Sequence, residues 1–267
     1  MSRVRLIASI AAAAVVATPA AAQAKTTISL SGSTSVAPLA RALAKKYTSV
    51  DKSLSFKLLQ GGSDTGINDV SRGRVSIGNA SRDPQSSDPK GLVFNKIARD
   101  AVCMITNPDN PIANLSQEQV QAIFSGKVRS WNQVPGAKAT GAISLISRTA
   151  ASGTGSAFKD IFLGPNLNVA ASSSAKNSNG LVNQAVRSDK DAIGFVSLDF
   201  VNGVAPVGYK GIPCTLQNAK SGEYGGTRNF WMVTRGRATG KSARFIRWIQ
   251  NSPAARRIVN TDWISIR

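Results

Sequence analysis

Stretches with β-strand character alternate with amphipathic helical patterns along most of the chain. We expect strands at 26–30, 53–59, 75–78, 97–106, 143–147, 193–197, 204–209 and 230–234. We expect helices at 36–47, 117–124, 155–162 and 241–259 and a further one that ends near 72, with Pro253 breaking the last helix. Ser116 and Gln119 have the spacing of a capping box at the start of the 117–124 helix. Such alternation favours an α/β architecture with mostly parallel sheets flanked by helices.

Residues 1–24 have the features of a cleaved signal peptide. Two arginines precede an apolar stretch at 6–17, and Pro19 and a small-x-small sequence at 22–24 follow. A membrane anchor is the alternative, but the apolar stretch is shorter than the roughly 18 residues that a span needs. We therefore expect a periplasmic protein whose mature chain begins near Lys25. In an oxidising compartment, Cys103 and Cys214 are expected to form a disulfide, with two separate buried thiols as the alternative.

The composition excludes several kinds of site. The chain has no histidine, which removes Ser-His-Asp and Cys-His nucleophile pairs and histidine-ligated zinc. Two cysteines cannot build a four-thiolate zinc or iron–sulfur centre. We therefore expect no metal and no cofactor.

The charge balance is strongly basic, with 33 Lys and Arg against 14 Asp and Glu. Nucleic-acid binding would need a dense basic run with interleaved aromatic residues, whereas aromatic residues make up only 6% of this chain. A positive exterior attracts small anions or an acidic surface. The alternative is a solvated surface without a partner. We expect no nucleic-acid partner.

A turn rich in Gly, Ser and Thr leads from a strand into a helix at three places. These turns are Gly32–Ser35, Gly62–Thr65 and Ser152–Thr154. Each brings backbone N–H groups, a hydroxyl and the positive end of a helix dipole to one point, which favours anion binding. Taken singly, such residues are ordinary helix caps. Three of them at the carboxyl ends of strands, with Arg148 four residues before Ser152, predict one pocket for a tetrahedral oxyanion.

The chain also resembles the phosphate-binding proteins of bacterial phosphate ABC transporters over nearly all of its expected mature length. The resemblance rests on 32–38, 61–67, 77–82, 107–111 and 123–131 and on the Arg-x-x-x-Ser-Gly-Thr spacing of Arg148 and 152–154. It implies a two-lobed periplasmic binding protein, each lobe a central, mostly parallel sheet flanked by helices, which closes by hinge motion. The expected lobes are 25–104 with 215–267, and 105–214.

The resemblance also implies the ligand, the partner and the residues of the site. The ligand would be inorganic phosphate, which a monomeric protein delivers to the membrane permease of the transporter. The expected phosphate-binding residues come from both lobes: Thr34, Ser35, Ser63, Asp64, Ser81, Arg82, Arg148, Ser152, Gly153 and Thr154.

One departure from the family pattern concerns selectivity. Well-described members place an aspartate directly after the Ala-Ser pair, whereas this chain has Arg82 there and Asp83 next. A carboxylate acceptor rejects sulfate, which carries no proton to donate. We expect Asp64 to take this role, or else Asp83, with Asp64 preferred because it begins a helix beside Ser63. A first-turn charge without a role in selectivity is the alternative for Asp64.

Other functions are also compatible with parts of the sequence. A binding protein for sulfate, molybdate or tungstate would use similar helix-start donors. Ser156 and Lys159 form the S-x-x-K of serine acyl-transfer enzymes, but the S-x-N element that such enzymes need is missing. Residues 236–242 resemble a phosphate-binding loop but have three residues between the glycines, where four are required. We interpret them as the basic first turn of the last helix.

Overall fold

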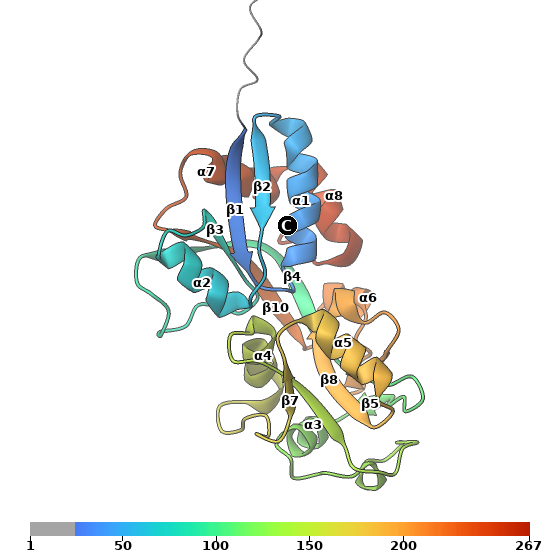
Figure 1. Cartoon of the computed structure of the whole chain (residues 1–267). Helices are drawn as coiled ribbons and strands as arrows, with labels where there is room; N and C mark the ends of the chain where they lie inside the picture. The colour runs from blue at the N-terminus through green and yellow to red at the C-terminus, as the bar shows by residue number, and fades with distance from the viewer. Residues whose placement is uncertain (1–24) are drawn as a thin grey trace, which may run out of the picture.

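The computed structural model describes residues 25–267 (Figure 1). The predicted signal peptide, residues 1–24, lies outside the described residues. The strands are β1 (Thr26–Gly32), β2 (Leu54–Leu58), β3 (Ile77–Ala80), β4 (Leu92–Thr106), β5 (Asn114–Leu115), β6 (Ser144–Arg148), β7 (Ser174–Lys176), β8 (Ala192–Ser197), β9 (Ala205–Tyr209) and β10 (Thr227–Arg235). The α-helices are α1 (Ala37–Val50), α2 (Ser63–Ser71), α3 (Gln117–Phe124), α4 (Gly153–Phe158), α5 (Asn179–Ser188), α6 (Leu216–Ser221), α7 (Gly240–Asn251) and α8 (Pro253–Asp262).

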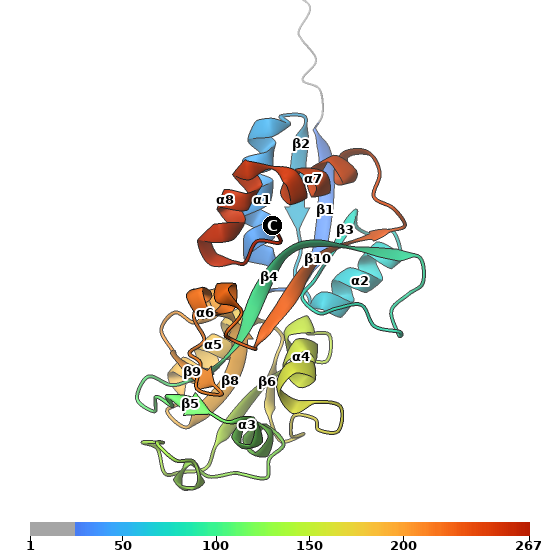
Figure 2. The ribbon, with the colours of Figure 1, turned by 180° about the vertical axis from the view of Figure 1, so that it is seen from behind.

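The strands form one mixed sheet in the order β2-β1-β3-β10-β4-β8-β6-β7, with β9 pairing with β4 and β5. The pairs β1–β2, β1–β3, β6–β7 and β6–β8 are parallel, as expected for an α/β fold. The antiparallel pairs all involve β4 or β10. The first part of β4 pairs with β10 and its last part with β8 and β9, so this long strand joins the two halves of the molecule (Figure 2).

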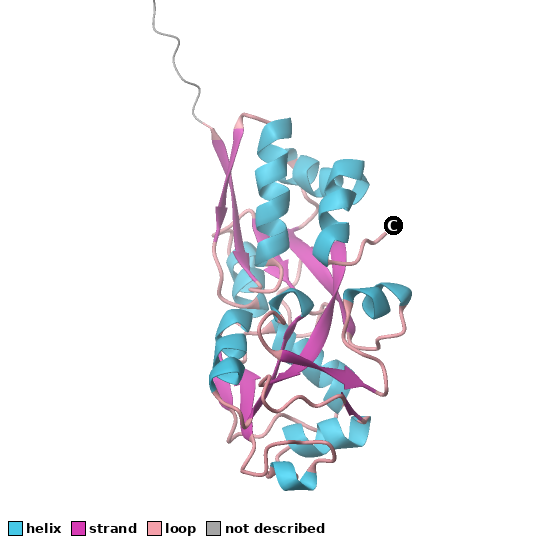
Figure 3. Cartoon of the chain, turned by 90° about the vertical axis from the view of Figure 1, so that its right-hand side faces the viewer, coloured by secondary structure: helices cyan, strands magenta, loops and turns pink. Residues whose placement is uncertain are grey.

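The first lobe is the half in which α1, α7 and α8 pack with β1, β2 and β3 around one hydrophobic cluster. Helix α1 buries Leu39, Leu43 and Tyr47 at helical spacing. The ring of Tyr47 lies 5.1 Å from that of Phe245 and 5.0 Å from that of Trp248, both on α7. Burial of side chains of this size contributes roughly 1.5–3 kcal/mol each. Figure 3 shows helices lying against the strands in both halves.

The second lobe is the half built around a separate cluster that includes Phe124, Phe158 and Phe195. Phe158 stacks on Phe195 with ring centroids 4.0 Å apart. At the start of α3, Ser116 and Gln119 form the predicted capping box. The predicted α/β, two-lobed fold is therefore confirmed.

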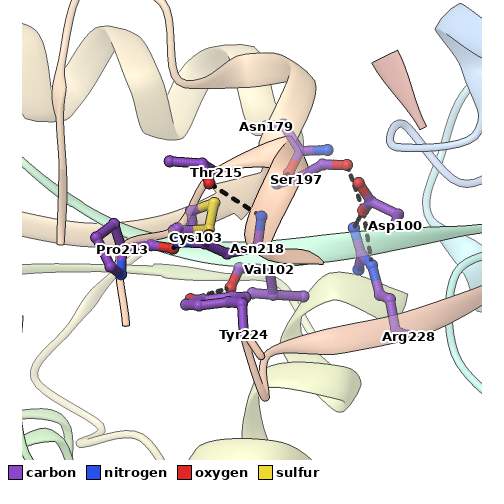
Figure 4. Close-up of a disulfide and its surroundings, with 11 residues drawn as sticks. Asp100, Val102, Cys103, Asn179, Ser197, Pro213, Thr215, Asn218, Tyr224 and Arg228 are labelled. Carbon is purple, nitrogen blue, oxygen red and sulfur yellow. Dashed lines mark hydrogen bonds and ion pairs between the residues drawn. A yellow bond between two sulfur atoms is a disulfide. The ribbon is translucent and has the colours of Figure 1, made fainter. Parts of the chain in front are cut away.

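The predicted disulfide is also confirmed. Cys103 on β4 is joined to Cys214, with Cα atoms 5.8 Å apart (Figure 4). The linked residues are 111 positions apart, so the bond stabilises the fold by at most about 4–5 kcal/mol in the chain-entropy account. Beside it, the Tyr224 hydroxyl donates to the carbonyl oxygen of Val102 at 2.9 Å.

The expected lobe boundaries at 104/105 and 214/215 remain predictions. The side chains of β4 change from the first-lobe cluster to the second-lobe cluster between Ala98 and Ala101. On the returning chain, Tyr224 packs in the second cluster and Phe230 in the first. Among residues 25–267, no helix is both long enough and apolar enough to span a membrane.

Candidate functional site

The turn after β1 brings three buried hydroxyl residues to the junction of the lobes. Gly32 has φ +127, and a Cβ at this position would collide with the carbonyl oxygen of Asn79. The Ser33 hydroxyl accepts from the backbone N–H groups of Ser35 and Val36 at 3.2 and 3.3 Å. This hydrogen bonding fixes the turn, and Thr34 and Ser35 are 5% and 0% exposed.

The second turn of the first lobe lies beside the first. Ser63 begins α2, and Ser81 follows β3 directly. The backbone N–H of Ser81 donates to the Ser63 hydroxyl at 3.0 Å, and the Ser33 hydroxyl donates to the Ser81 hydroxyl at 2.8 Å. Parallel β1 and β3 end at one edge of the sheet, which explains this proximity.

The third turn comes from the second lobe and meets the other two. The Ser152 hydroxyl accepts from the Gly155 N–H at 3.1 Å and so caps α4. The Thr154 hydroxyl lies 2.9 Å from the Ser35 hydroxyl. A Cβ at Gly153 would collide with the Ser63 side chain, so this position requires glycine for the observed contact. The structure thus brings together three turns that are far apart in sequence.

We call the six residues whose hydroxyls meet at this junction the hydroxyl cluster: Ser33, Thr34, Ser35, Ser63, Ser81 and Thr154. Each is at most 5% exposed. Hydroxyls both donate and accept, so they can bond to one another or to an oxyanion.

Arg148 at the end of β6 points into the hydroxyl cluster. Its guanidinium donates to the Thr34 hydroxyl at 3.2 Å, to the Asn179 side-chain oxygen at 3.1 Å and to the carbonyl oxygen of Lys176 at 3.1 Å. Within residues 25–267, no carboxylate forms an ion pair with it. Burial and, to a lesser extent, the nearby positive charge of Arg228 lower the pKa of Arg148 to about 9. A buried guanidinium without a carboxylate partner favours the binding of an anionic ligand.

Two residues that sequence reasoning missed complete the cluster. The side-chain amide of Asn179 donates to the hydroxyls of Thr34 and Ser35 at 3.0 and 2.9 Å. Arg228 donates to the Ser35 hydroxyl at 2.9 Å and to the carbonyl oxygen of Ser81 at 3.3 Å. Asn179 follows a serine and precedes a glycine at a helix start, a signal that could have identified it.

A buried carboxylate holds Arg228 in place (Figure 4). Asp100 Oδ2 accepts from Arg228 Nε and Nη2 at 3.0 and 2.8 Å and from the Ser197 hydroxyl at 2.6 Å. Burial raises the pKa of Asp100, while Arg228 and Ser197 oppose that rise. Because Asp100 occupies one side of the Arg228 guanidinium, the other side faces the hydroxyl cluster.

The acidic and basic residues expected near Ser81 form hydrogen bonds with one another and with residues outside the hydroxyl cluster. Arg82 donates to Asp64 at 2.9 Å and to Asp88 at 3.0 Å. Asp83 accepts from the side chains of Asn229 and Trp231 at 2.8 and 3.0 Å. The described contacts therefore place Arg82 and Asp83 around the cluster, without a direct hydrogen bond to its hydroxyls.

The arrangement suits a small, multiply charged oxyanion. Two buried guanidinium groups face a set of neutral donors, and one carboxylate, Asp100, contacts one of the two guanidiniums. In a dry site such fixed donors interact strongly with anionic oxygens.

Comparison with known proteins gives a consistent picture. Residues 17–252 match the model of the family described as PBP superfamily domain. Phosphate-binding protein PstS of Bacillus subtilis is 27% identical over 237 residues, covering 87% of this chain and 78% of that protein. The PstS of Borreliella burgdorferi is 26% identical, covering 84% of this chain and 85% of that protein.

Solved structures show the same likeness. A phosphate ABC transporter substrate-binding protein from Clostridium perfringens, with bound phosphate, superposes with a TM-score of 0.85 at 29% identity. The alignment covers 91% of this chain and all of that one. A phosphate transport receptor from Vibrio cholerae has a TM-score of 0.73 at 27% identity, covering 90% of this chain and all of that one.

Proposed function

The chain belongs to the PBP superfamily, and from this premise we propose that it binds inorganic phosphate between its lobes and delivers it to an ABC transporter. The names of the PstS relatives and of the phosphate-bound structure from Clostridium perfringens support this function. One observation carries the proposal: the turns of the first lobe contact both the second-lobe turn and Arg148 at one buried junction.

We propose the following roles for the residues of the site. Arg148 and Arg228 neutralise the charge of phosphate, and the hydroxyls of the cluster donate to its oxygens. Ser152 and Gly153 set the start of α4, whose backbone N–H groups close the site from the second lobe. Hinge motion in β4 and β10 would open the site for exchange of ligand.

Selectivity against sulfate is proposed to depend on Asp64. Its Oδ1 atom accepts from Arg82, while Oδ2 has no hydrogen-bond partner within the described chain. Asp83 is already held by two side-chain donors. We expect Asp64→Asn to lower the ratio of phosphate to sulfate affinity about tenfold, the size of one hydrogen bond of about 1.4 kcal/mol. Asp83→Asn is the matched control, and an unchanged ratio in both variants would contradict this role.

The setting of the proposed function is outside the cytoplasm, in contact with a membrane permease, with the protein acting as a monomer. The disulfide supports this location, because such bonds persist in oxidising compartments.

Titration calorimetry tests the proposed function. The protein is unfolded, dialysed and refolded to remove retained ligand, and then titrated with phosphate, arsenate and sulfate. We expect tight 1:1 binding of phosphate, competition by arsenate and no competition by sulfate at the same concentration. Tight sulfate binding with weak phosphate binding would assign the protein to another oxyanion.

A further inference from the structure

A second basic cavity lies in the first lobe, away from the hydroxyl cluster. It has a volume of about 320 Å³ and is bordered by the loop between α2 and β3, the middle of β1, the end of β10 and the start of α7. We call it the basic cavity and define it by six of its polar lining residues: Ser29, Arg74, Ser76, Arg235, Arg237 and Thr239. In Figure 2, the loop from β10 to α7 lies on the same side of the molecule as β3 and α2.

The basic cavity is separate from the site between the lobes. Ser76 precedes β3 and Ser81 follows it, so the two sites lie at opposite ends of this strand. With a rise of about 3.3 Å per residue, the separation is about 16 Å. A ligand in one site therefore does not reach the other.

Three guanidinium groups border the basic cavity with little to neutralise them. Arg235 packs against Gly73, with Nη1 3.7 Å from the position that a Cβ would take there. Arg74 lies 3.8 Å from Asp69, which also accepts from Ser31. Within residues 25–267, Arg235 and Arg237 have neither an ion pair nor a side-chain hydrogen bond. Like charges at one hollow repel one another unless an anion is present.

The neutral residues that line the basic cavity also provide hydroxyl groups that can donate hydrogen bonds. The hydroxyls of Ser29 and Ser76 lie 3.3 Å apart at one wall, and Thr239 precedes α7 without capping it through its side chain. Lys241 does not join them, since its ammonium donates to the Thr26 hydroxyl at 2.7 Å. This geometry differs from a nucleotide-binding loop, in which the lysine reaches the phosphates.

We propose that the basic cavity binds a multivalent phosphate anion, such as a short condensed phosphate. The volume falls in the range of roughly 300–1,000 Å³ that is typical of sites for small organic ligands, and a single orthophosphate would leave much of it unfilled. Three guanidinium forks match a ligand that carries several phosphoryl oxygens in different directions. The inference concerns a site distinct from the one proposed for orthophosphate.

Calorimetric titration with tripolyphosphate, at a constant saturating concentration of orthophosphate, tests this site. We expect one equivalent of tripolyphosphate to bind under these conditions. The double variant Arg235→Ala/Arg237→Ala should weaken that binding at least tenfold and leave orthophosphate binding unchanged. The control, Arg256→Ala/Arg257→Ala, removes two exposed charges from α8 and should change tripolyphosphate affinity less than twofold.

Two outcomes would overturn the proposal. One is the absence of heat with millimolar tripolyphosphate in the wild-type protein, and the other is an equal loss in the cavity and control variants, which would indicate non-specific attraction to a basic surface. The same titration in Arg148→Ala separates the two proposals. That variant lacks a central residue of the orthophosphate site but retains the basic cavity, so it should still bind tripolyphosphate.

Discussion

Two arginine-rich regions, one at the junction of the lobes and one in the first lobe, differ in how they hold their charge. At the junction of the lobes, Arg148 and Arg228 are 8% and 6% exposed, and each is fixed by several hydrogen bonds. Around the basic cavity, Arg235 and Arg237 are exposed and have no fixed partner within the described chain. The first region is preorganised in a medium of low dielectric, and the second is screened by water and salt. The difference predicts high affinity and selectivity at one site and salt-sensitive, charge-driven binding at the other.

The largest expected effect is that of Arg148→Ala on orthophosphate binding. Loss of a buried, charge-assisted contact costs about 3 kcal/mol, so the dissociation constant should rise at least 100-fold. Calorimetry measures it, and circular dichroism checks the fold. Arg235→Ala is the matched control and should leave orthophosphate binding unchanged. Equal losses in both variants would erase the distinction between the two regions.

Asp100→Asn should have the next largest effect, because it tests whether Arg228 is held by its buried carboxylate. A neutral amide oxygen accepts from Arg228 more weakly than a carboxylate does, so Arg228 is held less firmly toward the ligand and we expect orthophosphate affinity to fall about tenfold to thirtyfold. Arg228→Lys should weaken binding as much, since lysine lacks the fork that reaches both Asp100 and Ser35. Wild-type affinity in Asp100→Asn would show that Arg228 needs no such support.

Ionic strength should separate the two regions without any mutation. Raising potassium chloride from about 0.05 to about 0.5 M shortens the screening length several-fold and acts mainly on exposed charges. Tripolyphosphate affinity at the basic cavity should fall more than tenfold, and orthophosphate affinity less than about threefold. Parallel titrations measure both, and equal salt sensitivity would mean that the site between the lobes is open to solvent.

Substitution of Asp199 should have the smallest effect on phosphate binding, but it should clearly change the pH dependence of stability. Burial and, to a lesser extent, the neighbouring charge of Asp100 raise the pKa of Asp199 to about 7, while Ser197 and Arg228 oppose the rise. The folded state therefore holds a proton more tightly than the unfolded state does, and wild-type stability should fall as pH rises from about 4 to about 7.

Asp199→Asn removes this dependence. Urea unfolding should show the variant to be more stable than the wild type above pH 7, by at most about 4 kcal/mol, with the gap vanishing near pH 4. Asp109→Asn, at an exposed position, is the control and should leave the pH profile unchanged. A constant difference between variant and wild type at all pH values would contradict the raised pKa.

Much of the fold follows from local sequence patterns. The alternation of strands and helices, the capping box at Ser116 and the break before Pro253 are short-range features, and the structure has each of them. Helix α5 was missed because it begins Asn-Gly, which has low helix propensity, and its stability comes from packing on β8. Strand β4 begins five residues earlier than expected, because β10 extends its pairing back to Leu92.

The site was predictable only in part, because some of its residues are marked by local sequence patterns and others meet only through long-range pairing. The three turns carry a local signal, since hydroxyls and glycine stand at helix starts. Arg228 and Asp100 have no such local signal. They are 128 positions apart in the sequence and come into contact only because β4 pairs with β10. The partners of Arg82 likewise follow from the path of the loop after β3 rather than from its neighbours in sequence.

Anomalous diffraction from crystals grown with arsenate, a phosphate analogue with a strong scatterer, tests the central claim most directly. The account predicts one dominant arsenic peak at the lobe junction, within hydrogen-bond reach of the Ser35, Ser63 and Thr154 hydroxyls and of the Arg148 guanidinium. A dominant peak elsewhere, or a structure in which these four side chains surround no common anion, would contradict it.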